Sequence, residues 1–436
     1  MAQLLPLRAW RYADRFTENM EDLIAPLFDV VSINQREKLY ENPLNSIHLA
    51  VPKGMDASLE ASKTVMEWKS KGIIQQDAVA GIYVYYQYFR LPGEKEERCR
   101  KGFIAHVKAY DWEEKQILRH ENTIVSAVKD RVDLLRATQI QASPTHGLYE
   151  DENFELEEYL DKAISQPIYE IEDYQGVREV LAVIQDGPVI RKILDFLSQK
   201  QIILADGHHR LEGAISYKHE KEGSSSDKKW KGHEFHLMYL TNAFAKDLKI
   251  LPTHRLFYGL EMGQETFLAK LEEWFDVSRF LDAEELGTYA FHSPFTFGLL
   301  IGGEAYFLKL KVEKYWNLLP DLVPELKELD LVALHELVFH QILGMDQEKQ
   351  RSSDQLVYER NFSRCLQEVR SGKATFAVIT RELRMEEVLK VCKSGNVMPQ
   401  KSTYFYPKAV GGLLFGSIAQ DEFDYDYDAF FGKTEE

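Results

Sequence analysis

Residues 202–210 read Ile-Ile-Leu-Ala-Asp-Gly-His-His-Arg, and this stretch decides the fold that we expect. Its first four residues are short and apolar enough for a buried strand, and a helix is predicted from about Leu211 to Lys218. A turn between a buried strand and a helix directs backbone amide groups at whatever lies above it, and the helix dipole favours an anion there. The stretch therefore predicts a phosphate-binding turn within an α/β fold.

The side chains of this turn suit phosphate. Gly207 lets a ligand approach the backbone, and Arg210 offers a planar fork that matches phosphate oxygens. His208 and His209 supply further donors, and Asp206 would hold a metal ion or orient a histidine. The alternative is an ordinary turn in which Asp206 caps the helix and His208 satisfies buried backbone groups. Four polar side chains in five positions favour a functional site.

A second candidate lies at residues 120–123, His-Glu-Asn-Thr, ahead of a predicted helix that ends near Ala137. Thr123 can cap this helix, and Arg131 projects about two turns further on. Glu121 would lie beside the positive end of the helix, where a carboxylate can accept a proton from a substrate hydroxyl. A purely structural interpretation, with a capped helix and Arg131 in a solvated ion pair, is equally consistent with these residues.

A third candidate is the stretch 398–408, Met-Pro-Gln-Lys-Ser-Thr-Tyr-Phe-Tyr-Pro-Lys. Two lysines, two aliphatic hydroxyls and two stiffening prolines can clamp an anion. The same stretch can equally be an aromatic strand packed on the core, which is the interpretation we favour for Tyr404 and Tyr406. His254 and Arg255 form another polar pair, which is a weak signal alone.

The composition restricts the class of protein. The 436 residues carry a net charge of −17, which argues against a general nucleic-acid surface. Three cysteines without close spacing fit neither a disulfide framework nor a thiolate metal site, so a reducing compartment is expected. No segment approaches about 18 uninterrupted apolar residues, and we expect a soluble, cytoplasmic protein. The acidic end, 421–436, is interpreted as a solvated tail partly docked by its aromatic residues.

Alternating strand and helix patterns predict a mixed α/β fold, and the chain is long for one hydrophobic core. We expect an N-terminal α/β region at 1–115, a catalytic core at 116–232 and a C-terminal α/β region at 233–436 that completes the site. The predicted strands are 46–51, 82–89, 102–107, 202–205, 235–240, 297–301 and 374–379. The other predicted helices are 57–71, with Asp56 and Ser58 as candidate caps, 180–197, broken around Gly187-Pro188, 264–275, 329–343 and 385–393.

The order of these motifs resembles a widespread bacterial and archaeal family catalogued as domain of unknown function 1015. The resemblance begins at Leu27-Phe28-Asp29-Val30, passes through 120–123, 206–210 and 250–255, ends at 398–408 and so covers nearly the whole chain. The family usually shows Pro-Tyr-Asp-Val in the first motif. The tyrosine hydroxyl is therefore missing at Phe28 in this chain.

Within that family, the loop 206–210 is similar to the loop of free serine kinases of the ParB/sulfiredoxin-like fold, which phosphorylate the hydroxyl of free L-serine. The resemblance implies a ParB/sulfiredoxin-like core elaborated by additional mixed sheet and helices. It also implies that Glu121 is the general base and that Asp206 and His208 act with it in catalysis. The product would be O-phosphoserine.

The resemblance further implies a phosphoryl donor, for which pyrophosphate and a nucleotide (ATP or ADP) both remain open, and Mg²⁺, for which Asp206 is the candidate ligand. The candidates for gripping the donor are Gly207, His209, Arg210, Thr123, Arg131, Lys401, Ser402, Thr403 and Lys408, and those for contacting the substrate or supporting the site are His120, His254 and Arg255. Two rival hypotheses are a nucleotide-binding regulatory protein related to ParB and a phosphatase or nucleotide hydrolase. We expect a small-molecule partner, no nucleic acid and no membrane, and a homo-oligomer remains open.

Overall fold

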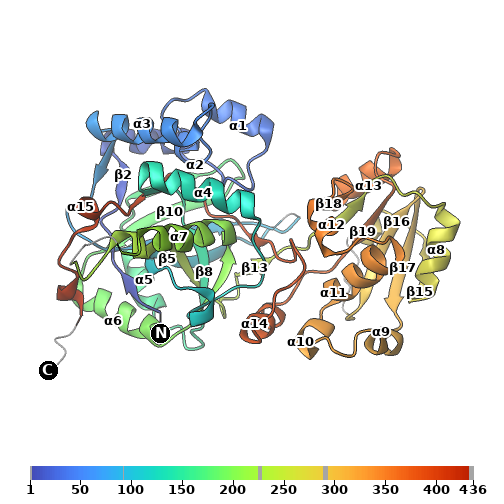
Figure 1. Ribbon diagram of the computed structural model, residues 1–436. Coiled ribbons are helices and arrows are strands. Elements are labelled where there is room, and N and C mark those ends of the chain that lie inside the picture. The colour runs from blue at the N-terminus through green and yellow to red at the C-terminus, as the bar shows by residue number, and fades with distance from the viewer. Residues whose placement is uncertain (1, 92, 224–227, 288–292, 432–436) are drawn as a thin grey trace. The chain divides into compact units, whose positions relative to one another are not determined.

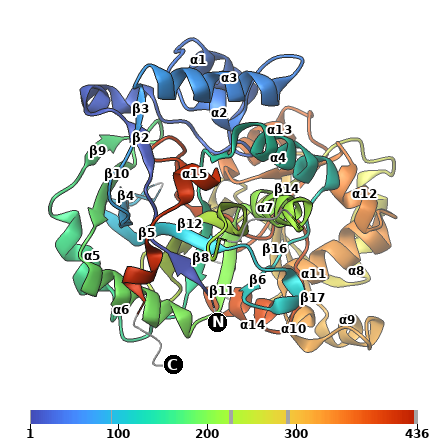
Figure 2. The same ribbon diagram turned by 60° about the vertical axis from the view of Figure 1, so that its left-hand side comes forward.

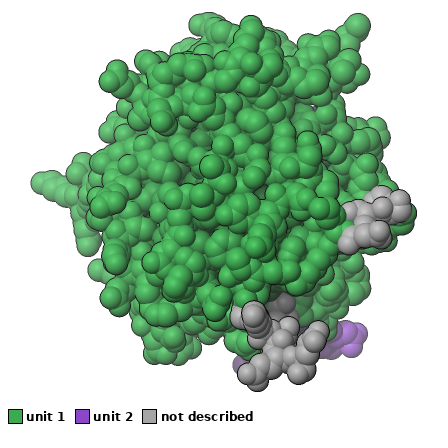
Figure 3. All heavy atoms as spheres, turned by 90° about the vertical axis from the view of Figure 1, so that its left-hand side faces the viewer, with its two compact units in different colours: residues 1–119, 123–249, 407–436 green, residues 120–122, 250–406 purple. Residues whose placement is uncertain are grey.

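The chain forms two compact units in its computed structural model, which describes residues 2–91, 93–223, 228–287 and 293–431 (Figure 1). Unit 1 comprises 1–119, 123–249 and 407–436, and unit 2 comprises 120–122 and 250–406; Figure 3 colours them green and purple. The sequence predicted three regions divided near residues 115 and 232. One sheet of unit 1 crosses both of those positions.

Unit 1 is built on a nine-stranded mixed sheet. Its strands are β1 (Leu4–Leu5), β4 (Ile82–Phe89), β5 (Arg98–Lys108), β6 (Ile117–Leu118), β8 (Thr145–Tyr149), β9 (Tyr169–Glu172), β10 (Arg178–Ile184), β11 (Ile202–Asp206) and β12 (Phe235–Asn242). Their order is β6-β11-β8-β12-β5-β4-β10-β9, with β1 on β5. β6 runs parallel to β11 and β8 parallel to β12, while the other pairs are antiparallel. The predicted mixed α/β class is confirmed.

Helices cover both faces of this sheet. They are α1 (Ile33–Tyr40), α2 (Ile47–Ala50), α3 (Ala57–Ser70), α4 (Val125–Thr138), α5 (Glu157–Ile164), α6 (Gly187–Ser198), α7 (His208–Lys221) and α15 (Gln420–Phe423). α4 and α7 lie side by side in both ribbon views (Figure 2). Two small ladders, β2 (Trp10–Tyr12) with β3 (Ile74–Gln76) and β7 (Ile140–Gln141) with β21 (Gly416–Ser417), complete unit 1.

Two predicted elements of unit 1 were wrong. The stretch 46–51 is not a strand but contains α2, because the buried Asn45 side chain accepts the amide of Ile47 at 2.8 Å and starts a helical turn. The stretch 180–197 is not one helix but β10 followed by α6. Asp186 accepts the amide of Val189 at 3.1 Å, so the Gly-Pro pair marks a helix start rather than a kink.

The central strand β4 divides its residues between two apolar cores. Ile82, Val84 and Tyr86 belong to the core on one face, while Tyr83 and Tyr85 belong to the core on the other. This alternation follows from the period of two in a β-strand. The sheet is therefore buried on both faces, and any polar side chain within it needs a partner inside the protein.

A buried polar network in this sheet leads towards residue 408. Tyr85 donates to the carboxyl group of Glu179 at 2.8 Å, and the Gln87 amide donates both to Glu179 and to the carbonyl of Lys408, each at 3.1 Å. Arg100 in turn donates to the Gln87 side-chain oxygen at 3.0 Å through its Nε. Burial raises the pKa of Glu179 to about 8, so the group is neutral at neutral pH.

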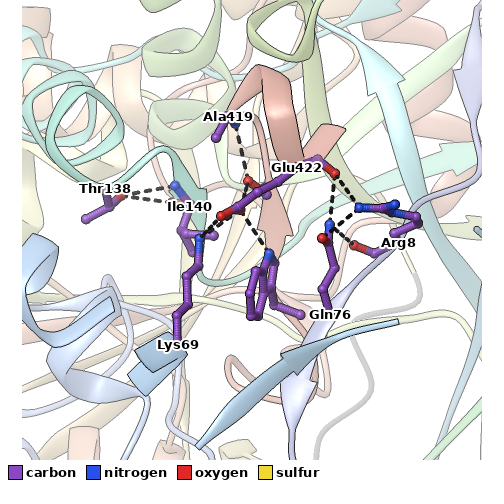
Figure 4. A network of polar contacts seen from close by, with 9 residues as sticks. Arg8, Lys69, Gln76, Thr138, Ile140, Ala419 and Glu422 are labelled. Carbon is purple, nitrogen blue, oxygen red and sulfur yellow. Dashed lines mark hydrogen bonds and ion pairs between the residues drawn. The ribbon is translucent and has the colours of Figure 1, made fainter. Parts of the chain in front are cut away.

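The C-terminal segment is fastened to the N-terminal strands through Glu422 (Figure 4). The Glu422 carboxylate accepts from Lys69 at 2.6 Å, from the Trp10 indole at 2.9 Å and from the Ser417 hydroxyl at 2.6 Å. Its carbonyl accepts from the Gln76 amide at 2.8 Å. The following aromatic residues Phe423, Tyr427 and Phe430 are buried. The acidic end is thus docked by its aromatic residues as far as residue 431, and 432–436 lie outside the described residues.

Unit 2 contains a six-stranded antiparallel sheet in the order β15-β17-β16-β19-β14-β18. These strands are β14 (His254–Phe257), β15 (Phe275–Phe280), β16 (Thr296–Ile301), β17 (Glu304–Leu310), β18 (Leu356–Glu359) and β19 (Phe376–Ile379), and the short β13 (Lys249–Ile250) and β20 (Phe405–Tyr406) lie outside this sheet. The helices are α8 (Gln264–Glu272), α9 (Val312–Leu318), α10 (Pro324–Lys327), α11 (Asp330–Leu334), α12 (Gln347–Ser352), α13 (Phe362–Arg370) and α14 (Met385–Lys393).

The helix predicted at 329–343 changes type part-way along. It consists of α11 followed by a π-helix at His335–Ile342. Helices of this type are rare and occur frequently at functional sites. Across the described ranges, every helix is too short or too polar to cross a membrane.

The contacts of Glu422 predict that a single conservative substitution at this position lowers the stability of the protein. Glu422→Gln keeps the size of the side chain but removes its charge, which leaves Lys69 without its carboxylate partner. We expect the free energy of unfolding to fall by about 2 kcal/mol in urea titrations. Asp421→Asn, an exposed neighbour in α15, is the control and should change it by less than about 0.5 kcal/mol. Equal effects of the two substitutions would contradict the role given to Glu422.

Glu179 predicts a pH dependence of stability. Its pKa is about 8 in the folded protein against an ordinary value of 4.5, so the folded state binds more protons between these limits. The free energy of unfolding should therefore fall as the pH rises from about 4.5 to about 8. Glu179→Gln cannot ionise, and its decline over this range should be smaller in urea titrations. The control is Glu170→Gln on the exposed side of β9, which should keep the wild-type slope. If the free energy of unfolding of Glu179→Gln fell with pH as steeply as that of the wild type, the Glu179 carboxyl would be ionised in the folded protein.

Candidate functional site

The turn at 206–208 joins β11 to α7 through a glycine that no other residue replaces easily. Gly207 has φ +90°, in the left-handed region. A Cβ at this position would lie 2.6 Å from Thr145 Cγ2 and 2.9 Å from Arg210 Nη2. Asp206 does not cap the helix, because it is the last residue of β11 and Gly207 occupies the cap position. A helix start without a capping side chain leaves its amide groups suited to an anion.

Asp206 lies between two buried cations. Lys408 Nζ donates to one carboxylate oxygen of Asp206, and Arg210 Nη2 donates to the other at 2.9 Å. Burial alone would raise the pKa of Asp206, but Lys408 and Arg210 hold it well below its usual range. Two cations and one anion leave one net positive charge in the cluster, which we call the Asp206 cluster. A bound oxyanion at the start of α7 would compensate that charge.

The guanidinium of Arg210 is already engaged by protein oxygens. Besides Asp206, it donates through Nη1 to the carbonyl of Pro144 and, at 3.2 Å, to the hydroxyl of Ser143. The side chain is 6% exposed. Arg210 can therefore contribute its positive charge to phosphate binding, but its guanidinium is not free to donate two hydrogen bonds to phosphate as predicted.

Mg²⁺ does not fit at Asp206. Divalent cations of this kind need several oxygen ligands, and both oxygens of this carboxylate already accept from cationic donors. Among the residues that the structure describes, no three His, Cys, Asp or Glu side chains form a group that could hold a metal ion. No chemical step is therefore assigned to a metal at Asp206.

The two histidines of the turn have different surroundings. His208 is buried, at 7% exposure, while His209 is half-buried. The Nε2 atom of His209 accepts the amide of Ile124 at 3.0 Å, which fixes the ring at the start of α4. Thr123 was predicted to cap that helix, but the cap residue is Ile124, which has no capping side chain, and His209 accepts the amide of this residue. The start of α4 is thus tied to the start of α7.

Arg131 was predicted to grip the donor or to form a solvated pair, and it is 8% exposed. Its Nη1 donates to the carbonyl of Ala50 at 2.8 Å, and its Nε donates to the exposed Asp130 at 2.9 Å. The guanidinium carbon lies 4.4 Å from the ring centroid of Phe28. This cation–π contact needs only an aromatic face, which is why phenylalanine suffices at position 28.

Unit 2 brings together two candidate stretches that are 280 residues apart in sequence. The Glu121 carboxylate accepts the amide of Lys401 at 3.3 Å, and His120 Nε2 lies 2.8 Å from the hydroxyl oxygen of Thr403. The Ser402 hydroxyl donates to the carbonyl of Pro399 at 2.5 Å, within the same loop. Lys401 has φ +55°, so the loop turns sharply at this residue. The stretch 398–408 is divided, because Lys408 belongs to unit 1 and pairs with Asp206.

A pocket of about 730 Å³ lies in unit 2. Asn122, Tyr358 and the loop 396–400 form part of its lining. Glu121 itself is not among the lining residues, but its charge acts on the ionisation of Tyr358, which is. This pocket is large and open, whereas the Asp206 cluster is buried and charged.

His254 and Arg255 lie in the sheet of unit 2, on β14. His254 Nδ1 accepts the amide of Thr380 at 3.3 Å, and burial lowers the pKa of this histidine to about 4. Arg255 donates through Nε to His335 at 3.2 Å. Both side chains are thus held by buried partners, and the supporting role predicted for them stays a prediction.

Several polar groups near the candidate residues had no direct signal in the sequence. Glu179 and Arg100 support the carbonyl of Lys408 through Gln87, and His335 and Tyr358 accompany Arg255. One signal was available in β4, where a glutamine continues the alternation of tyrosines on one face of a strand. A polar residue on a buried face of a strand indicates an internal partner.

Comparison with known proteins yields a family and several distant structures. Residues 4–332 match the family described as "Protein of unknown function (DUF1015)". No curated protein matches the sequence. Solved structures with some likeness include a conserved hypothetical protein from Pyrococcus furiosus, at 14% identity and a TM-score of 0.33, which covers 66% of this chain and 87% of its own.

A free serine kinase in complex with AMP has 14% identity and a TM-score of 0.35, and covers 66% of this chain and 83% of its own. SbnI with C-terminal truncation from Staphylococcus aureus has 12% identity and a TM-score of 0.35, and the match covers 75% of this chain and 92% of the SbnI chain. At these TM-scores the likenesses establish neither an activity nor a ligand for this chain. The match over residues 4–332 does establish the family: the chain belongs to the DUF1015 family.

Proposed function

We propose that this protein is a phosphotransferase that moves a phosphoryl group from a nucleotide or pyrophosphate to an alcohol hydroxyl. The observation that carries the proposal is the Asp206 cluster, a buried group of Lys408, Asp206 and Arg210 with one net positive charge at the start of α7. Phosphoryl transfer depends mainly on positioning the reactants and cancelling charge on the phosphoryl oxygens. A helix start and a net positive cluster supply both.

The donor phosphates are assigned to the turn at 206–209. Gly207 permits the left-handed backbone conformation with which the turn enters the helix, and the amide groups of the first helical turn suit phosphate oxygens. Lys408 and Arg210 neutralise charge through the buried cluster, while Asp206 holds them in place. His208 and His209 are further donors to the phosphate in this proposal.

Glu121 is assigned as the general base. It takes the proton of the acceptor hydroxyl as that oxygen forms its bond to phosphorus, and the bond from phosphorus to the leaving phosphate oxygen breaks. The amide of Lys401 orients the carboxylate, and His120 with Thr403 braces the same loop. The motif resemblance to free serine kinases supports L-serine as an acceptor and O-phosphoserine as its product.

Removing the charge of Lys408 should weaken donor binding. Lys408→Met leaves the cluster without net positive charge, so the affinity for ATP, ADP or pyrophosphate should fall by about tenfold or more in calorimetric titrations. Lys246→Met, at an exposed lysine of unit 1 whose side chain is 83% exposed, is the matched control and should bind normally. Thermal unfolding of both variants monitors folding. Unchanged affinity for all three donors in a folded Lys408→Met protein would contradict the donor assignment.

Replacing the proposed base should separate chemistry from binding. Glu121→Gln retains shape but cannot accept a proton, so transfer to serine should fall by roughly 10²- to 10⁴-fold. Donor affinity should stay within about twofold, because the donor is assigned to other residues. Phosphoserine is measured by mass spectrometry, with the exposed Glu152→Gln as control. Full activity of Glu121→Gln would place the base elsewhere, and phosphate release that serine does not increase would identify a hydrolase.

A further inference from the structure

The pocket of unit 2 contains more space than the proposed acceptor, free serine, would need. Its volume of about 730 Å³ lies within the range of about 300–1,000 Å³ found for sites that bind drug-sized ligands. One wall is apolar and consists of Leu319, Leu322, Leu326 and Val332. This wall would bury an apolar body of several carbon atoms, which serine lacks.

Behind the pocket lies a buried cation without an acidic partner. Arg255 is 0% exposed, and among the described residues no carboxylate pairs with it. Burial lowers the pKa of Arg255 to about 10, so the group still carries its charge at neutral pH. Its Nη2 finds no hydrogen-bond partner in the part of the chain that the structure describes. A buried, uncompensated charge is costly, and an anionic ligand nearby would reduce that cost.

The position of Arg255 is fixed by the π-helix. Its Nε donates to His335 Nε2 at 3.2 Å, so the ring proton of His335 lies on Nδ1 and is donated to the Gln350 side-chain oxygen at 2.8 Å. Burial lowers the pKa of His335 to about 3, so the ring is neutral. The network therefore holds the cation of Arg255 without compensating its charge.

Tyr358 connects this cation to the pocket. It lies directly opposite Arg255 in the pairing of β14 with β18, and the guanidinium carbon is 5.4 Å from its ring centroid. Tyr358 lines the pocket, yet its hydroxyl has no partner among the described residues. Arg351, a second cation, also lines the pocket. Both Arg351 and Glu121 lie close enough to Tyr358 to affect its ionisation. Tyr358 thus has a hydroxyl without a partner among the described residues, and the charges of Arg255, Arg351 and the proposed base act on it.

Two of the three acidic side chains that line the pocket have hydrogen-bond partners of their own. Glu336 accepts from His340 at 2.9 Å and from Gln341 at 2.8 Å, and Asp346 caps α12 by accepting the amide of Lys349 at 2.8 Å. Glu348 is exposed. The lining thus combines the four apolar side chains and these acidic groups with Tyr358 and Arg351, the part of the pocket that suits an anion.

We propose that this pocket binds the acceptor, and that the acceptor is a hydroxy carboxylate whose apolar body is larger than that of free serine. Its carboxylate accepts from the Tyr358 hydroxyl under the charges of Arg255 and Arg351. Its body lies on the leucine wall, and its hydroxyl approaches Glu121, which takes the proton as the new oxygen–phosphorus bond forms and the donor bond breaks. The role as acceptor rests on the proposed function; the binding of such an acid to the pocket does not.

The test uses a graded series of probes on the full-length protein. L-serine, N-acetyl-L-serine, N-hexanoyl-L-serine and the methyl ester of the last are titrated calorimetrically into the wild type, Tyr358→Phe and Tyr306→Phe. Tyr306→Phe is the matched control, because this tyrosine lies in the same unit, bonds to Glu304 and is not part of the pocket lining. Thermal unfolding shows whether each variant is folded.

We expect affinity to rise with the acyl chain by roughly twofold to fourfold per methylene, because each one is buried on the leucines. The ester, which lacks the charge, should bind at least about tenfold more weakly than the acid. Tyr358→Phe should weaken the acid about fivefold or more while leaving the ester nearly unchanged, and Tyr306→Phe should match wild type. Leu322→Gln, which makes the wall polar, should remove the benefit of the longer chain.

Two results overturn the proposal: N-hexanoyl-L-serine binds no better than serine, or its binding does not depend on Tyr358 in a folded variant. Incubation of wild type with the bound acid and each donor then examines the proposed function separately. A phosphorylated acid supports both proposals. Binding that depends on Tyr358 without any phosphorylated product would overturn the assignment as acceptor, while the carboxylate site in unit 2 would stand and the proposed function would be decided by transfer to serine.

Discussion

The buried contacts of Asp206 with Lys408 and Arg210 are the interaction on which the organisation of unit 1 depends. They join the end of β11 to a residue 202 positions later in the chain. Because the three groups carry one net positive charge away from water, they need both exact placement and a nearby anion. Gly207 and the amide groups of α7 provide the place where such an anion fits.

The rest of the polar core of unit 1 supports this contact. Glu179, Gln87 and Arg100 form a buried chain whose last hydrogen bond reaches the carbonyl of Lys408, so the backbone of that lysine is fixed from within the sheet. Unit 2 also contains a buried cation that is held by polar side chains. There, His335 fixes the cation of Arg255 beside an open pocket, and the compensating anion would come from a ligand.

Much of the local structure followed from the sequence, whereas the partners of charged residues did not. The strand, turn and helix around Asp206 were predicted from a short apolar run followed by glycine and polar residues. The element at 46–51 was mistaken because an asparagine side chain starts a helical turn where the apolar pattern indicates a strand. Thr123 was expected to cap α4, but the cap position lies one residue later, at Ile124, whose amide is accepted by a histidine distant in sequence. Periodicity records which face is buried, and it carries no information on such long-range pairs.

The central claim is that phosphate binds at the start of α7, next to the Asp206 cluster. A crystal structure of the protein soaked with pyrophosphate or ADP tests this claim most directly. The account predicts a phosphate group within hydrogen-bond distance of the amide groups of His208 and His209, with Gly207 in contact with it. Phosphate bound at a different position, with the start of α7 left without an anion at saturating ligand, would contradict it.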